Sequence, residues 1–302
     1  MNPEDSVIPR LPVGDWVKDG VDWLTDNASG LFDLIKVVFS TVTEGLTDGL
    51  TAVPALVMIV LLALVAWAVR SWKLALGTAV MFLVVLSMGQ WEHMMETTAL
   101  VLVATVIAVV IAIPVGILAA RSRVASAIVR PILDFMQTMP AFVYLIPTVV
   151  FFSIGVVPGI VSTIIFALPP GVRMTELGIR QVDSETVEAG EAFGATPWQI
   201  LSGIQLPLAV PTIMAGINQV IMLALSMGVI AGMVGAPGLG KEVVAGISTL
   251  DLPLGVEAGL SVVFLAVFLD RLTAALGNPG DRSGSLLNVV ARARARRAAA
   301  GA

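Results

Sequence analysis

Long runs without a charged side chain dominate this 302-residue sequence and restrict what it can fold into. Five runs extend over 18 to 49 consecutive residues: 49–69, 74–91, 97–120, 135–172 and 192–240. A helix needs about 20 mostly apolar residues to cross the hydrocarbon core of a bilayer. The chain is also only 13% charged, whereas a soluble domain is about 25% charged. The sequence therefore predicts an all-α membrane protein.

The runs predict a polytopic bundle of about seven transmembrane helices. The first three runs have the length of one span each. The run 135–172 is long enough for two spans, and the turn residues of Ser153–Gly159 predict a hairpin between them. Residues 208–233 and 253–272 supply the last two spans, although Glu257 lies inside the second of these.

The distribution of Lys and Arg predicts an external N-terminus and a cytoplasmic C-terminus, because inward-facing loops carry an excess of basic residues. In this orientation 13 of the 17 basic residues face the cytoplasm. These residues are Arg70, Lys73, Arg121, Arg123, Arg130, Arg173, Arg180, Arg271, Arg282, Arg292, Arg294, Arg296 and Arg297.

The ends of the chain differ from the transmembrane domain, which we assign to residues 49–276. Residues 1–48 are acidic, and we expect an external tail with an amphipathic helix at the membrane interface. The helical spacing comes from Leu31, Leu34, Ile35, Val38, Phe39 and Val42. Residues 277–302 end in an Ala/Arg tract, which indicates a cytoplasmic basic tail near lipid headgroups.

Composition excludes several kinds of site. The chain has no cysteine and a single histidine, His93, so disulfides, thiolate catalysis and histidine-rich metal centres are excluded. No basic patch with interleaved aromatic residues suggests a nucleic-acid partner. Gly235–Glu242 resembles a phosphate-binding loop, but it lacks the Ser or Thr after Lys241 and does not follow a strand. We expect an external turn there, an interfacial position for His93, and neither a catalytic residue nor a bound cofactor or metal.

The connection 183–207 lies on the cytoplasmic side in this topology and predicts two short helices. Residues 182–193 form the first helix, which Gly194 ends. Thr196, Pro197 and Gln199 then provide a helix cap, a first helical residue and a capping-box partner. We expect the second helix to end at Pro207, where the sixth span begins.

This connection resembles the EAA motif of binding-protein-dependent ABC transporter permeases. The motif residues match at both spacings: Glu188, Ala189, Gly190, Gly194, Ile204, Leu206 and Pro207. Gly190 replaces the second alanine of the motif. The resemblance implies that the loop docks on a partner ATPase and transmits its movement to the pore. Trp198 either anchors the loop at the membrane interface or packs against that ATPase.

Further segments resemble the glycine betaine/proline (osmoprotectant) importer subgroup. They are Asp134–Pro147, Ala167–Pro170 with Arg173 and Thr175, Leu223–Met227, and Leu269–Arg271. The resemblance implies a type I ABC importer permease fold in a prokaryotic plasma membrane. It also implies a second copy of the chain, an external solute-binding protein, and a cytoplasmic ATPase that holds the ATP and Mg.

The resemblance implies that the chain lets a compatible solute such as glycine betaine, proline betaine or proline cross the membrane. It also implies that the chain itself is not an enzyme. Arg173 and Glu176 either pair within one helix or line the pathway or gate, where Phe142 and Tyr144 are further candidates. The alternatives are a permease for another small solute, such as choline or an amino acid, and a secondary transporter. The latter predicts inverted repeats and intramembrane carboxylates.

Overall fold

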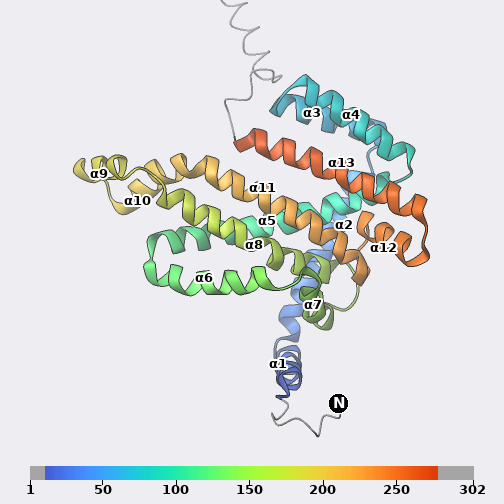
Figure 1. Ribbon diagram of the computed structural model, residues 1–302, viewed down its shortest axis with the longest axis horizontal. Coiled ribbons are helices and arrows are strands. Elements are labelled where there is room, and N and C mark those ends of the chain that lie inside the picture. Colours follow the sequence, from blue (N-terminus) through green and yellow to red (C-terminus); the bar gives the residue numbers. More distant parts are fainter. Residues whose placement is uncertain (1–10, 278–302) are drawn as a thin grey trace, which may run out of the picture.

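The computed structural model describes residues 11–277, and all regular elements in that part of the chain are helices (Figure 1). Three long helices form the centre of the bundle: α5 (Trp91–Arg121), α8 (Val156–Arg180) and α11 (Leu206–Ile230). Helix α8 packs along both of the others. The predicted all-α fold is therefore confirmed.

Small residues let these three helices approach closely. A Cβ on Gly171 of α8 would lie 2.8 Å from Cβ of Ala112 on α5. A Cβ on Gly216 of α11 would lie 2.5 Å from Cβ of Met174 on α8. Because lipid is as apolar as the side chains, membrane helices associate through such close packing rather than through a hydrophobic driving force. These contacts fix how α8 sits against its two neighbours.

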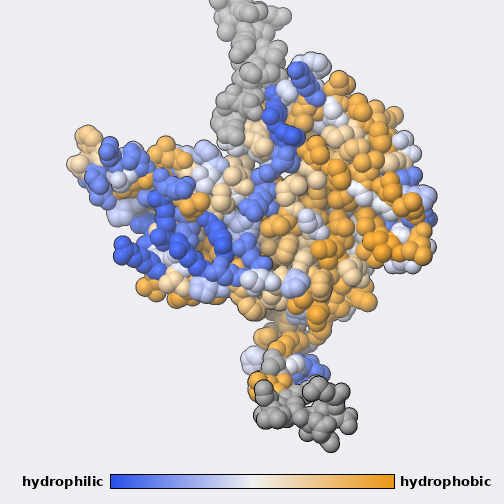
Figure 2. All heavy atoms as spheres, viewed as in Figure 1, coloured by the Kyte–Doolittle hydropathy of each residue, from blue (hydrophilic) through white to orange (hydrophobic). Residues whose placement is uncertain are grey.

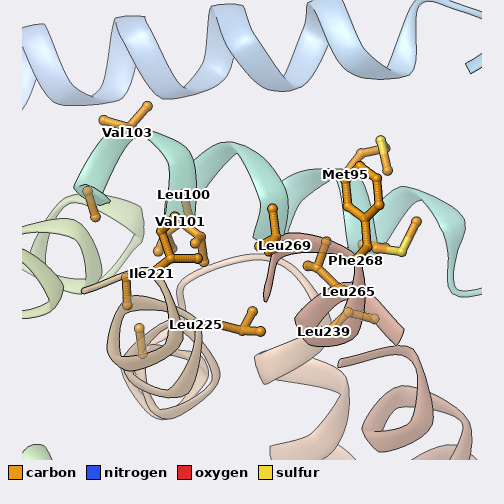
Figure 3. Packing of buried hydrophobic residues seen from close by; sticks show 14 of the residues in the cluster. Met95, Leu100, Val101, Val103, Ile221, Leu225, Leu239, Leu265, Phe268 and Leu269 are labelled. Atoms are coloured by element: carbon orange, nitrogen blue, oxygen red, sulfur yellow. The ribbon is translucent and has the colours of Figure 1, made fainter. Parts of the chain in front are cut away.

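The other helices pack around this centre. Helices α3 (Ala55–Val69) and α4 (Trp72–Ser87) form a hairpin against α13 (Leu252–Gly277), while α2 (Ser29–Thr51) packs along α5. Figure 3 shows the apolar side chains that meet between α5, α11 and α13: Leu100, Val101, Ile221, Leu225, Leu265 and Leu269. Phe82 of α4 joins this core by contacting Phe268 of α13 edge-on, with ring centroids 5.1 Å apart.

Four stretches of the described chain are long and apolar enough to cross a membrane: α5, α8, Pro197–Val234 and α13. Two bent pairs raise the number to six if each pair is one span. One pair is α2 with α3; the other is α6 (Arg123–Thr138) with residues 141–152. Helix α4, which covers the second predicted span, is apolar but has 16 residues, and it is the candidate for a seventh crossing.

The first half of the run 135–172 differs from the prediction of one span. Helix α6 already ends at Thr138, and the chain bends by 108° before η2 (Ala141–Tyr144) and α7 (Leu145–Phe152). The bend lies at Pro140, because a proline pushes the preceding residue out of the helical region. Met139 accordingly has the extended angles φ −73° and ψ 134°.

The predicted turn between the two halves is present but shorter than expected. Ser153 has φ 64° and Gly155 has φ 140°, and the Gly155 N–H donates to the Val234 carbonyl at 3.0 Å. Helix α8 then begins at Val156, so Pro158 lies in its first turn instead of in the loop. Proline is tolerated there because the first N–H groups of a helix have no partner within it.

The N-terminal part of the described chain is helical from residue 13. Helix α1 (Val13–Asn27) is followed by α2, which begins before the amphipathic segment seen in the sequence and continues past residue 48 to Thr51. The boundary and interfacial position expected for this region stay predictions. The expected basic tail, beyond Gly277, lies outside the described residues.

Candidate functional site

The connection after α8 forms a hairpin of two short helices, which we call the coupling hairpin (residues 183–207). Its first helix, α9 (Ser184–Ala192), begins at Asp183, whose Oδ1 accepts from the Glu185 N–H at 3.2 Å. It ends at Gly194, which has φ +78° and donates its N–H to the Glu191 carbonyl at 2.9 Å. A left-handed glycine is the usual end of a helix, so the predicted stop is confirmed.

The second helix of the hairpin, α10 (Pro197–Ile200), has the predicted capping box. The Thr196 hydroxyl accepts from the Gln199 N–H at 3.4 Å, and Gln199 Oε1 accepts from the Thr196 N–H at 2.7 Å. Pro197 follows the cap, at the helix start, where its missing N–H costs nothing. These reciprocal bonds fix the turn between the two helices.

The expectation that this helix ends at Pro207 is wrong. Helix α10 continues through a π-helical turn, η3 (Leu201–Gln205), into α11. The Leu206 N–H donates to the Leu201 carbonyl, and Pro207 follows in the first turn of α11. The wider turn leaves room for a proline whose ring would clash in a regular helix interior. The second helix of the hairpin and the next span therefore belong to one helical stretch, Pro197–Val234.

The motif residues divide into an exposed and a packed group. Glu188 and Ala189 are exposed on α9, as is Pro207. Gly190 lies against the η3 helix, where Ile204 packs on it. Leu206 packs against the small core of Ile179, Leu201 and Ala209, between α8 and α11. The hairpin is thus held on one side and open on the other.

Two large apolar side chains project from the open side of the coupling hairpin. Phe193 is 93% exposed and Trp198 is 67% exposed. The sequence analysis gave Phe193 no role, because a single apolar residue at a helix end also fits ordinary packing. Its exposure is visible only once the turn at Gly194 is formed.

A second group of polar residues lies in a groove between α6 and α8, with a volume of about 340 Å³. Figure 2 shows hydrophilic side chains gathered where α6, α8 and α9 lie, whereas much of the remaining visible face is hydrophobic. The residues lining this charged groove are Arg130, Asp134, Arg173, Met174, Glu176, Leu177 and Arg180.

Glu176 is the buried member of the charged groove, with a side chain that is 5% exposed. Its Oε1 accepts from the Ser126 hydroxyl at 2.8 Å and from Arg130 at 2.9 Å, and Arg180 lies 3.1 Å away. Burying a carboxylate is energetically costly unless hydrogen-bond donors surround it, and these donors meet that need. Glu176 thus joins α6 to α8.

Arg173 does not pair with Glu176 within α8, as the sequence allowed, but contacts Asp134 on α6. The bend after α6 makes that helix run beside α8, and three-residue spacing within one helix gave no sign of it. Tyr144 donates its hydroxyl to the Met136 carbonyl and lies edge-on to Phe166, so it holds the bend after α6. Phe142 is exposed.

The glycine-rich segment 235–242 forms the turn between η4 (Ala231–Val234) and α12 (Leu239–Thr249). The Leu239 N–H donates to the Thr97 hydroxyl of α5 at 2.8 Å. His93 Nδ1 lies 3.2 Å from Glu96 Oε2, and His93 Nε2 lies 3.7 Å from Glu242 Oε1. Within residues 11–277 no group of three or more His, Cys, Asp or Glu side chains could hold a metal ion.

A helical membrane bundle with an inserted coupling hairpin defines a transport subunit, and comparison with known proteins specifies its family. Residues 112–278 match the family described as binding-protein-dependent transport system inner membrane component. The chain belongs to this family.

Curated relatives cover most of the chain. The glycine betaine transport system permease protein OpuAB of Bacillus subtilis is 49% identical over 266 residues, which are 88% of this chain and 94% of the relative. The glycine betaine/proline betaine permease ProW of Escherichia coli is 46% identical over 91% of this chain and 78% of the relative. The glycine betaine/carnitine permease GbuB of Listeria monocytogenes is 47% identical over 89% of this chain and 96% of the relative.

Solved structures agree with the fold. A chain of the inward-facing MetNI methionine ABC transporter matches with a TM-score of 0.55 and 27% identity, over 65% of this chain and 96% of that chain. The type I ABC importer permease fold expected from the sequence is thus confirmed.

Proposed function

We propose that this chain is the permease subunit of an ATP-driven importer for a compatible solute such as glycine betaine, proline betaine or proline. The names of the relatives at 46–49% identity support this solute class over methionine, choline or another amino acid. The observation that carries the transport role is the coupling hairpin, which continues without a break into a membrane-spanning helix.

ATP hydrolysis belongs, in this proposal, to a separate cytoplasmic ATPase that binds ATP and Mg. The exposed side of the coupling hairpin supports such docking: Glu188 and Ala189 lie on it, and Phe193 and Trp198 project from it. Gly190, Ile204, Leu206 and Pro207 form the base of the hairpin, and Gly194 sets the angle between its helices. Pushing the exposed side would move α11, because Gly190 of α9 packs on Ile204 and α10 continues through η3 into α11.

The remaining partners are an external solute-binding protein and a second copy of this chain, in the plasma membrane of a prokaryote. The N-terminus lies outside and the C-terminus in the cytoplasm. Arg173 and Glu176 belong, in this proposal, to the cytoplasmic part of the pathway, and their place in the charged groove between α6 and α8 supports it. Phe142 is exposed and could therefore form part of a gate in this proposal. Tyr144 acts indirectly, because its hydrogen bond to Met136 fixes the bend after α6.

The decisive experiment is uptake by reconstituted vesicles that contain this chain, its ATPase and its binding protein. ATP-dependent accumulation of labelled glycine betaine, and not of methionine, is expected. Uptake of the same solute driven by an ion gradient alone would instead show a secondary transporter. ATP-dependent uptake of methionine or choline alone would show a permease for a different solute.

A further inference from the structure

The charged groove between α6 and α8 holds two ion pairs of different character. The Glu176 side chain is 5% exposed and has Ser126, Arg130 and Arg180 around it. Arg173 and Asp134 are 40% and 64% exposed and are paired with each other. The first pair is part of the packing between the helices. The second is accessible from the groove.

An accessible ion pair at this position requires water or protein around it. Arg173 lies seven residues before the end of α8, about 10 Å along the axis at the helical rise of about 1.5 Å per residue. A charged side chain in the lipid core is energetically unfavourable. Within the described residues, the exposed sides of Arg173 and Asp134 have no protein cover. This face of α6 and α8 therefore faces water or another protein surface instead of lipid.

Arg173 also has unused capacity for hydrogen bonding. It contacts Asp134 through Nη2, and its Nε is buried and has no hydrogen-bond partner within the described residues. A guanidinium can hold a carboxylate with two parallel N–H groups, so the present contact uses part of its capacity. Exposed ion pairs contribute little to stability, so exchanging this partner for another carboxylate costs little.

We propose that Arg173 and Asp134 form a low-affinity subsite for a zwitterionic solute on its way through the permease. The solute carboxylate pairs with Arg173 and its cationic group with Asp134, so the net charge of the groove stays balanced in every state. The groove volume of about 340 Å³ lies in the range of about 300–1,000 Å³ known for ligand pockets. Met174 and Leu177 supply apolar contact for the body of the solute. The subsite rests on the proposed function, which supplies the solute class.

The test is ligand-observed saturation-transfer NMR on the detergent-solubilised permease–ATPase complex without binding protein. Glycine betaine and choline are the probes, because they share the trimethylammonium group and only betaine has a carboxylate. The wild-type complex is expected to give a betaine signal. Arg173→Gln should reduce the betaine signal about tenfold, equal to about 1.4 kcal/mol, and leave the choline signal. Asp134→Asn should reduce both the betaine and the choline signal, and Arg173→Lys should keep the betaine signal.

The control is Lys18→Gln/Asp22→Asn, which removes an exposed ion pair in α1 far from the groove along the chain. Its signals should equal those of the wild type, as should the thermal unfolding midpoint of each groove variant. If Arg173→Gln does not fold, the Arg173→Lys and Asp134→Asn comparison carries the test. An unchanged betaine signal in the double variant Asp134→Asn/Arg173→Gln would overturn the subsite. The absence of a betaine signal with the wild-type complex would overturn it as well. The proposed function fails separately, if the wild-type importer shows no ATP-dependent betaine uptake.

Discussion

Gly190 lies so close to Ile204 that a Cβ on the glycine would stand 2.7 Å from Cδ1 of the isoleucine. The backbone of α9 thus rests on the side chain that leads into α11. A movement of α9 is therefore transmitted to η3, because tightly packed side chains leave few voids that could absorb it. Gly190 is also the position at which this chain departs from the EAA motif.

Replacing Gly190 by larger residues should separate packing from helix propensity. Gly190→Ala should change the free energy of unfolding by less than about 1 kcal/mol, because the gain in helix propensity of about 0.5–1 kcal/mol offsets a small rotation of Ile204. Gly190→Leu should displace α9 and lower solute uptake at least about tenfold. Uptake assays and thermal unfolding measure both effects. Wild-type uptake by Gly190→Leu would contradict this account of the contact.

Neutralising Glu188 should weaken the association with the ATPase. Glu188→Gln keeps the size of an exposed side chain on α9 but removes its charge. Charged pairs at an interface are worth about 1.5–7 kcal/mol when close, so the affinity for the ATPase, measured by co-purification, should fall at least about tenfold. Glu185→Gln is the matched control, as Glu185 is also exposed on α9. Equal ATPase recovery from both variants would remove Glu188 from the docking surface.

Removing the buried carboxylate of Glu176 should destabilise the junction of α6 and α8. Glu176→Ala takes away the acceptor shared by Ser126 and Arg130. Hydrogen bonds to charged groups contribute about 1.5–3 kcal/mol each, so losing two of them should lower the free energy of unfolding by about 3–6 kcal/mol. Asp22→Asn, which breaks an exposed pair with Lys18, should cost less than about 1 kcal/mol. Similar unfolding midpoints for the two variants would show that the buried cluster is not structural.

Two glycine-to-alanine changes should have opposite effects. A Cβ on Gly232 would lie 2.3 Å from the carbonyl carbon of Gly240, so Gly232→Ala forces the start of α12 away from η4. Overpacking of this kind costs about 1–3 kcal/mol or more. Gly77 in α4 has open space instead, so Gly77→Ala should stabilise the helix by about 0.5–1 kcal/mol. Thermal unfolding of the detergent-solubilised protein compares them, and a stabilising Gly232→Ala would refute the contact.

Local chemistry made the coupling hairpin predictable. The Thr196–Gln199 capping box and the left-handed Gly194 depend on neighbouring residues, and both are present as expected. The charge-free run 135–172, in contrast, did not predict the 108° bend after Thr138. A run without charged residues indicates only that the segment lies in an apolar environment. The pairing of Arg173 with Asp134 depends on that bend. No residue spacing within a single helix could have indicated it.

The π-helical turn at Leu201–Gln205 makes the number of residues between hairpin and span critical. Each residue in a regular helix turns the chain by about 100°, given 3.6 residues per turn. A π-helical turn holds one residue more than an α-helical turn, so deleting one residue there would leave a regular helix. An inserted residue cannot be absorbed in this way and would rotate the hairpin about the helix axis by roughly that amount, which would aim Phe193 and Trp198 in another direction. Insertions at this point should therefore be far less tolerated than substitutions, even where every side chain that touches a partner is kept.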